Sequence, residues 1–253
     1  MLSIFKRTLF LLLAFPAITA LPQTQTPTNL GSVVNSSARD AEPTFPADGQ
    51  TMYFNCFDRE GEEGSDICVS HLEGEDWGEP SIVWEVSTRE HLEVEPLLSP
   101  DGQQLYIMSN RPGGKGGMDI WVSDYVDGKW SSPTNLDAPI NSAYADHCLY
   151  FSGDDWEIAY WTSTRPGGFG GNDIWTSERV DGVWQEAKNL GPTINTAASE
   201  HHSLPSPDGK SLYITTTREG GFGGEDIFVT TRGEDGDWSE LRNLGAQVNS
   251  DQH

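Results

Sequence analysis

The sequence predicts an all-β fold, a β-propeller of four-stranded antiparallel blades, and three observations support this prediction. A glycine- and tryptophan-containing phrase recurs four times, and its tryptophans at positions 77, 130, 184 and 238 are 53 or 54 residues apart. Each copy holds short runs of β-branched and aromatic residues between turn signals. No window shows sustained helical periodicity. Repetition of such a sheet unit around an axis is typical of a propeller.

The amino-terminal segment differs from the repeats. Lys6 and Arg7 precede an apolar run that ends in small residues near Ala20, which predicts a secretory signal peptide at 1–20. The remainder divides into a linker at 21–28 and one propeller domain at 29–253, with units at 29–81, 82–134, 135–188 and 189–242 and a closing tail at 243–253. We expect four blades. An incomplete five- or six-bladed propeller is the alternative, because the tail begins a further unit.

The second unit illustrates the four strands expected in each blade. An apolar stretch at 95–99 leads into a Pro-Asp-Gly turn, and "QQLYIMS" at 103–109 alternates as a strand does. After the glycine-rich phrase, "DIWVSD" at 119–124 predicts a third strand, and Asp-Gly marks the next hairpin. The run "KWSSPTNL" at 129–136 predicts an edge strand, where Pro133 does little harm.

The repeated phrase, written "RPGGKGGMDIW" at 111–121, has a structural explanation. Its glycines permit positive φ angles and a close approach between neighbouring blades. We expect Asp119 to accept backbone N–H bonds from the loop, and Ile120 and Trp121 to pack on opposite faces. The recurring arginines are expected to pair with a loop carboxylate of the same or the next blade; they are Arg111, Arg165 and Arg218.

Charge and cysteines narrow the function classes. The net charge of -24 argues against nucleic acid and anionic lipid surfaces as partners, and leaves cations, cationic ligands and neutral sugars open. Nothing after the predicted signal peptide is apolar enough to cross a membrane. Cys56 and Cys68 flank the first glycine loop, so a hairpin would place them on neighbouring strands and favours a disulfide bond. Cys148 is then left as a half-buried thiol.

The combination of "SPDG…LY", "GG.GG.DIW" and "NLG..VN" resembles the TolB-type, WD-repeat-like β-propeller repeats of bacterial exported proteins, over roughly residues 29–250. The resemblance implies a periplasmic or secreted binding module that acts beside envelope proteins. It does not by itself fix an activity, because propellers host many functions.

The repeat also predicts a ring of acidic residues. Eight residues before each turn aspartate, on the strand expected to line the central channel, the chain carries Asp40, Glu93, Asp146 and Glu200. Two positions later it carries Glu42, Glu95, Cys148 and His202. Converging carboxylates repel unless a cation lies between them, so the four acids predict a divalent cation site assisted by His147, His201 or His202. Calcium is favoured, and histidine would shift the choice toward zinc. Alternatively, the acids cap backbone N–H groups or pair with arginines.

For function, the sequence favours an exported, non-catalytic module that binds a protein, a peptide or a cell-envelope glycan. The candidate ligand-binding residues are His147, His201, His202, Trp156 and Tyr144, the last two because they break the repeat consensus. The alternative is an enzyme that cleaves a glycan or peptide with acidic and histidine residues at the channel mouth. No catalytic constellation singles out a residue for that role.

Overall fold

A computed structural model describes residues 29–59, 64–153 and 156–251. The predicted signal peptide at 1–20 and the linker at 21–28 lie outside the described residues. The described part of the chain is all-β and contains no helix. Four antiparallel sheets follow one another along the chain, and the predicted four-bladed propeller arrangement is confirmed. None of the described residues forms a helix that could cross a membrane.

The strands of each blade are as follows. Blade 1 contains β1 (Asp40–Thr44), β2 (Thr51–Phe57), β3 (Ser65–Glu73), β4 (Asp76–Trp77) and β5 (Ser81–Ile82). Blade 2 contains β6 (Glu93–Leu98), β7 (Gln104–Ser109), β8 (Asp119–Val126), β9 (Lys129–Trp130) and β10 (Thr134–Asn135). Blade 3 contains β11 (Asp146–Ser152), β12 (Ile158–Ser163), β13 (Asp173–Val180), β14 (Val183–Trp184) and β15 (Lys188–Asn189). Blade 4 contains β16 (Glu200–Pro205), β17 (Ser211–Thr216), β18 (Asp226–Thr231) and β19 (Arg242–Asn243).

The fourth run of each unit is more divided than the sequence indicates. In blade 2, β9 and β10 both pair with β8, and the residues between them leave the sheet. Pro133 lies in this interruption and has no backbone N–H to donate, but blade 3 is interrupted in the same way at 185–187 without a proline. The blade is therefore three long strands with a short hairpin extension and a two-residue edge strand.

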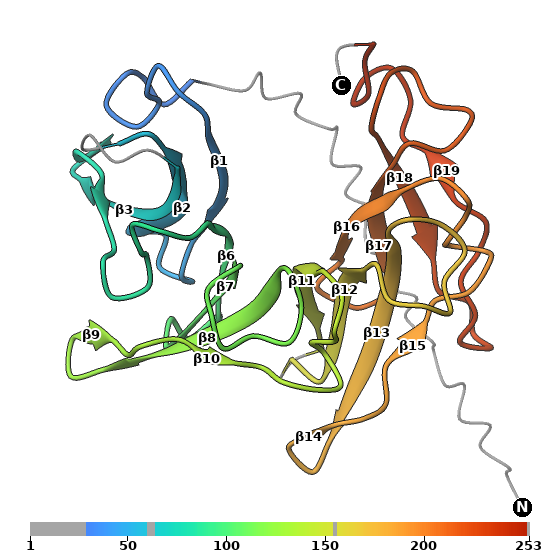
Figure 1. The fold of residues 1–253 in the computed structure, drawn as a ribbon. Coiled ribbons are helices and arrows are strands. Elements are labelled where there is room, and N and C mark those ends of the chain that lie inside the picture. The colour runs from blue at the N-terminus through green and yellow to red at the C-terminus, as the bar shows by residue number, and fades with distance from the viewer. Residues whose placement is uncertain (1–28, 60–63, 154–155, 252–253) are drawn as a thin grey trace, which may run out of the picture.

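The blades contact one another mainly through β1, β6, β11 and β16 (Figure 1). Within the described residues, no strand of blade 1 contacts a strand of blade 4, and the two blades face each other across an opening. The tail after β19 packs on its own blade, because Asn249 exchanges hydrogen bonds with the backbone of Ile227 at 2.8 and 2.9 Å. That the tail closes a ring stays a prediction.

Alternating side chains of the second strands fill the junctions between blades. On β7, Leu105 and Ile107 pack toward blade 1, whereas Tyr106 and Met108 pack toward blade 3. Tyr160 makes the equivalent contact with blade 4 and is 2% exposed. In blade 4 the equivalent Tyr213 is 38% exposed, because no further described blade packs on that side.

The glycine-rich phrase behaves as predicted. The Asp173 carboxylate accepts the backbone N–H of Phe169 at 3.0 Å, and Asp119 and Asp226 accept the equivalent bonds from Lys115 and Phe222 in blades 2 and 4. A Cβ atom on Gly170 would lie 2.3 Å from the carbonyl oxygen of Ala198, in the segment leading to the next blade. The glycine is required there because any side chain would push the neighbouring segment away.

The cysteines are arranged as the sequence predicts for the first pair. Cys56 on β2 and Cys68 on β3 form a disulfide bond with Cα atoms 5.8 Å apart. Cys148 on β11 is a free thiol and is buried, 3% exposed, rather than half-buried.

Candidate functional site

The four acids predicted to hold a cation begin the innermost strands, and each pairs with an arginine of its own blade. In blade 3, Asp146 Oδ1 lies 2.6 Å from Arg165 Nη2, and the aspartate is fully buried. The equivalent pairs are Asp40–Arg59 at 3.0 Å, Glu93–Arg111 at 2.9 Å and Glu200–Arg218 at 3.2 Å. The prediction that the arginines pair with a carboxylate of their own blade is therefore confirmed, but the partner is an acid that begins the innermost strand and not a loop carboxylate.

The same acids also cap backbone groups of the segment that precedes each strand. Asp146 Oδ2 accepts the backbone N–H of Ser142 at 2.6 Å and its hydroxyl at 2.7 Å. Glu200 accepts the N–H of Thr196 at 2.9 Å in the same way. The carboxylates are thus already neutralised and hydrogen-bonded, which is the alternative that the sequence left open. A cation at Asp40, Glu93, Asp146 and Glu200 stays a prediction.

A different set of side chains is aimed at the axis by irregularities in the innermost strands. The pairing of β6 with β7 shifts register between Val94 and Leu97, and β11 shifts between His147 and Tyr150. Glu95 and Cys148 occupy these bulges with φ angles of 53°. A bulge inserts an extra residue and re-aims its side chain. Left-handed φ is unusual for such residues, and it occurs where surrounding structure enforces it.

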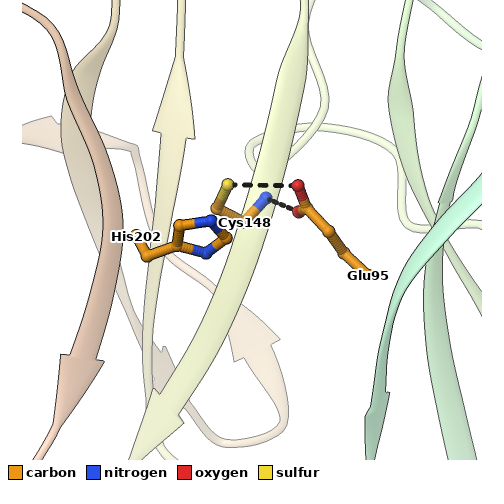
Figure 2. A group of neighbouring side chains, drawn as sticks. All are labelled: Glu95, Cys148 and His202. Carbon is orange, nitrogen blue, oxygen red and sulfur yellow. Dashed lines mark hydrogen bonds between the residues drawn. The ribbon is translucent and has the colours of Figure 1, made fainter. Parts of the chain in front are cut away.

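The bulges bring together Glu95, Cys148 and His202 from three different blades (Figure 2). Their ligand atoms, a carboxylate oxygen, a thiol sulfur and an imidazole nitrogen, all lie within 4.8 Å of one another. The backbone N–H of Cys148 donates to Glu95 Oε2 at 2.6 Å, and its thiol donates to Oε1 at 3.4 Å. We call Glu95, Cys148 and His202 the inner cluster.

Neighbouring side chains surround the inner cluster with further polar atoms. His147 Nδ1 lies 3.1 Å from Cys148 Sγ, and the Tyr150 hydroxyl lies 3.1 Å from His202 Nδ1. The Glu42 carboxylate accepts a hydrogen bond from the Asn55 amide at 2.5 Å. A cavity of about 220 Å³ adjoins the cluster and is lined by Glu42, Glu95, Cys148 and Tyr150 among others.

Burial and mutual repulsion shift the ionisation of these groups. Burial and the nearby Glu42 carboxylate raise the pKa of Glu95 to about 7. Burial also raises the pKa of the Cys148 thiol well above its ordinary value. The pKa of His147 is lowered to about 4, first by burial and then by His201, and burial lowers that of His202. The site therefore favours neutral side chains near neutral pH.

Of the remaining predicted ligand-binding residues, His201 lies beside His147, whereas Tyr144 and Trp156 lie elsewhere. His201 has its ring centroid 6.1 Å from that of His147, and its Nδ1 lies 2.5 Å from Glu225 Oε1. The structure therefore places His147 and His201 next to each other beside the inner cluster, to which His202 itself belongs. Tyr144 is 46% exposed on a loop before β11, and Trp156 lies in a different groove.

That groove lies between blades 2 and 3, where the innermost strands end. It has a volume of about 550 Å³. The Phe151 and Trp156 rings stack with centroids 4.4 Å apart, and the Trp184 ring also stacks on Phe151, with centroids 5.7 Å apart. Polar side chains complete the lining; they are Asp101, Gln103, Gln104, Asp124 and Arg179. We call this surface the aromatic groove.

Sequence reasoning found only one residue of the aromatic groove. Trp156 drew attention because the turn before β12 departs from the repeat, and it has a left-handed φ of 55°. Phe151 and Trp184 belong to the ordinary strand pattern, so nothing in the sequence separates them from packing residues. Glu95 and Cys148 were visible as repeat positions, but the bulges that turn them inward were not.

Solved structures with a similar fold include TolB from Acinetobacter baumannii, with a TM-score of 0.53 and 19% identity over 83% of this chain and 44% of that one. The putative TolB from Agrobacterium tumefaciens gives 0.52 and 18%, over 82% and 62%. A puromycin-hydrolyzing peptidase from Mycobacterium tuberculosis gives 0.51 and 15%, over 83% and 30%.

The chain spans about half the length of these TolB structures, between 44% and 62% of them. No family model matches the sequence, and no curated protein matches it either. At these identities the comparisons establish a TolB-like β-propeller fold, as the sequence repeats predict. They leave ligand and activity to be argued from the chain's own residues.

Proposed function

We propose that this protein is an exported, non-catalytic binding module whose aromatic groove holds a segment of a neutral glycan. The observation that carries the proposal is the stack of Trp156, Phe151 and Trp184 along one wall of a 550 Å³ groove. Aromatic rings offer flat apolar faces to the C–H faces of sugars, while precisely placed polar groups fix orientation.

The polar lining of the groove suits hydroxyl groups. Gln104 Nε2 donates to Asp124 Oδ1 at 2.9 Å and its Oε1 accepts from Tyr106 at 2.8 Å, so these side chains are held in place. Asp101, Gln103 and Arg179 add donors and acceptors around them. The two carboxylates that line the groove, Asp101 and Asp124, belong to blade 2, and with a net charge of -24 the protein suits a neutral ligand better than an anionic one.

Export is part of the proposal. The predicted signal peptide at 1–20 supports it, as does the Cys56–Cys68 disulfide bond, because disulfides persist in oxidising compartments outside the cytoplasm. The TolB-like fold agrees with a protein that acts through binding. An enzyme that cleaves glycan or peptide remains the alternative prediction, and turnover of the bound chain in the assay below would favour it.

The test is co-sedimentation with purified peptidoglycan, cellulose, xylan and mannan, followed by calorimetry with soluble oligosaccharides of whichever polymer binds. Trp156→Ala and Trp184→Ala should each weaken binding about tenfold or more, since stacked aromatics dominate such sites. Trp238→Ala is the matched control, because Trp238 has the place of Trp184 in blade 4 and lies outside the groove. Binding that survives both groove variants, or binding to none of the polymers, would overturn the proposal.

A further inference from the structure

We propose that Glu95, Cys148 and His202 form a binding site for a zinc ion, with ligands contributed by β6, β11 and β16. This inference is independent of the glycan proposal, because none of the three residues lines the aromatic groove. It also differs from the acidic ring predicted from the sequence, whose carboxylates are paired with arginines.

The donor set decides the metal. A thiolate, an imidazole and a carboxylate are the three ligand types that zinc takes, and a soft sulfur ligand disfavours calcium and magnesium. Their ligand atoms lie within 4.8 Å of one another. In a tetrahedral zinc site the ligand atoms are roughly 3.5 Å apart, so modest side-chain rotation around the ion completes the site.

The backbone is shaped to present these ligands. Glu95 and Cys148 lie in bulges on adjacent innermost strands, both with φ of 53°, and Glu42 has φ of 56° at the equivalent place in blade 1. Three non-glycine residues in left-handed conformation at the same repeat position indicate a geometry enforced by the fold. A regular strand would direct these side chains between the blades instead.

The surroundings supply what a metal site needs beyond its ligands. The Tyr150 hydroxyl contacts His202 Nδ1 at 3.1 Å and so orients the ring, as outer hydrogen bonds do for metal-bound histidines. The adjoining 220 Å³ cavity leaves room for a water molecule or a small ligand at the fourth position. His147, at 3.1 Å from Cys148 Sγ, adds a neutral polar group beside the sulfur.

Binding requires the thiol to lose its proton. Without metal, the Cys148 thiol donates to Glu95 Oε1. When zinc binds, the S–H bond breaks heterolytically, sulfur keeps the electron pair and binds the ion, and the proton passes to solvent. No redox partner is needed for this step. Because a proton is released, metal affinity rises with pH.

Cobalt(II) is the probe, because thiolate-to-cobalt charge transfer absorbs in the near ultraviolet. Cys148 is the only free thiol among the three cysteines, since Cys56 and Cys68 are bonded to each other. The EDTA-treated full chain should therefore gain the band on cobalt titration and lose it when zinc is added. Cys148→Ser should abolish the band.

Glu95→Gln and His202→Asn should each weaken zinc binding in calorimetry at least tenfold, whereas His71→Asn, an exposed histidine on β3, should leave it unchanged. Far-ultraviolet circular dichroism confirms that each variant is folded. A Cys148→Ser protein that binds zinc as tightly as the natural chain would overturn the proposal. So would a natural chain that shows no thiolate band with excess cobalt.

Discussion

The guanidinium of Arg165 lies 2.6 Å from the carboxylate of Asp146, and its Cζ atom lies 5.2 Å from the ring centroids of both Trp161 and Trp175 in the same blade. Removing the arginine alone leaves a buried carboxylate unpaired. We therefore expect Arg165→Ala to lower the free energy of unfolding by about 3 kcal/mol or more, measured by urea denaturation.

The control for this pair is the exposed ion pair between Lys115 and Asp137 at 3.0 Å. Lys115→Ala should change the unfolding free energy by less than about 1 kcal/mol, since solvent screens the interaction. Equal losses in the two variants would mean that burial of the Asp146 pair contributes nothing.

Two adjacent glycines of the loop in blade 3 should differ sharply in how much an alanine substitution destabilises the protein. A Cβ atom on Gly170 would lie 2.3 Å from the Ala198 carbonyl oxygen, whereas one on Gly171 meets nothing within 4 Å. Gly170→Ala should destabilise the protein by about 1 to 3 kcal/mol because it forces neighbouring segments apart. Gly171→Ala should be neutral or slightly stabilising in the same thermal denaturation series. Identical melting temperatures for the two variants would contradict close packing at this junction.

The disulfide bond should stabilise blade 1. Cys56 and Cys68 are separated by 12 positions, and closing a loop of that size contributes about 3 kcal/mol by restricting the unfolded chain. The double variant Cys56→Ala/Cys68→Ala should unfold at correspondingly lower urea concentration. Adding a reductant should destabilise the natural chain but leave the double variant unchanged, which separates the bond from the packing of the side chains.

The inner cluster should make stability depend on pH. The pKa of Glu95 in the folded protein, about 7, is above its ordinary value of 4.5, so its contribution to stability is full below pH 4.5 and is lost as pH rises through 7. His147 has the opposite effect, because its pKa of about 4 is below its ordinary value of 6.5, and its contribution to stability is lost as pH falls through 4. In the natural chain the two groups therefore change the free energy of unfolding with pH in opposite directions.

Glu95→Gln removes only the pH dependence of stability that is due to Glu95. Relative to the natural chain, and in the presence of EDTA, the variant should gain about 2 kcal/mol in unfolding free energy between pH 4.5 and pH 7.5. Each pH unit between the two pKa values is worth about 1.4 kcal/mol, reduced here because Glu95 is only half-buried. Glu178→Gln, an exposed acid on β13, serves as the control. A difference between Glu95→Gln and the natural chain that is constant with pH would argue against the shifted carboxyl.

The blade architecture could be predicted because its signals are local and repeated. The unit length follows from the spacing of four tryptophans, Trp77, Trp130, Trp184 and Trp238. The hydrogen bonds of the loop aspartates and the close contacts of the loop glycines could be predicted from residue type and position. The acid–arginine pairs were also within reach, since an arginine follows each acid by 18 or 19 positions in all four units. Each of these patterns has one dominant physical explanation.

The inner cluster was less accessible because it depends on strand register. One extra residue in a bulge reverses the face on which every later side chain lies. Neither Glu95 nor Cys148 belongs to a residue type that prefers left-handed φ, so no local preference marks the bulge. The aromatic groove could not be predicted for another reason. In the sequence Phe151 and Trp184 look like packing residues, and only the structure shows that they line a groove together with Trp156, whose turn departs from the repeat.

Pairing each acid with an arginine of its own blade has a consequence for how such a chain can change in length. Every unit carries both members of its buried ion pair, so duplication or loss of a whole unit leaves no orphaned charge in the protein interior. As far as these ion pairs are concerned, lateral junctions need only matching surfaces and small loops, and the cross-blade polar contacts include those around the inner cluster. The number of blades is in this sense free to vary in evolution without any change to the acid–arginine pairs.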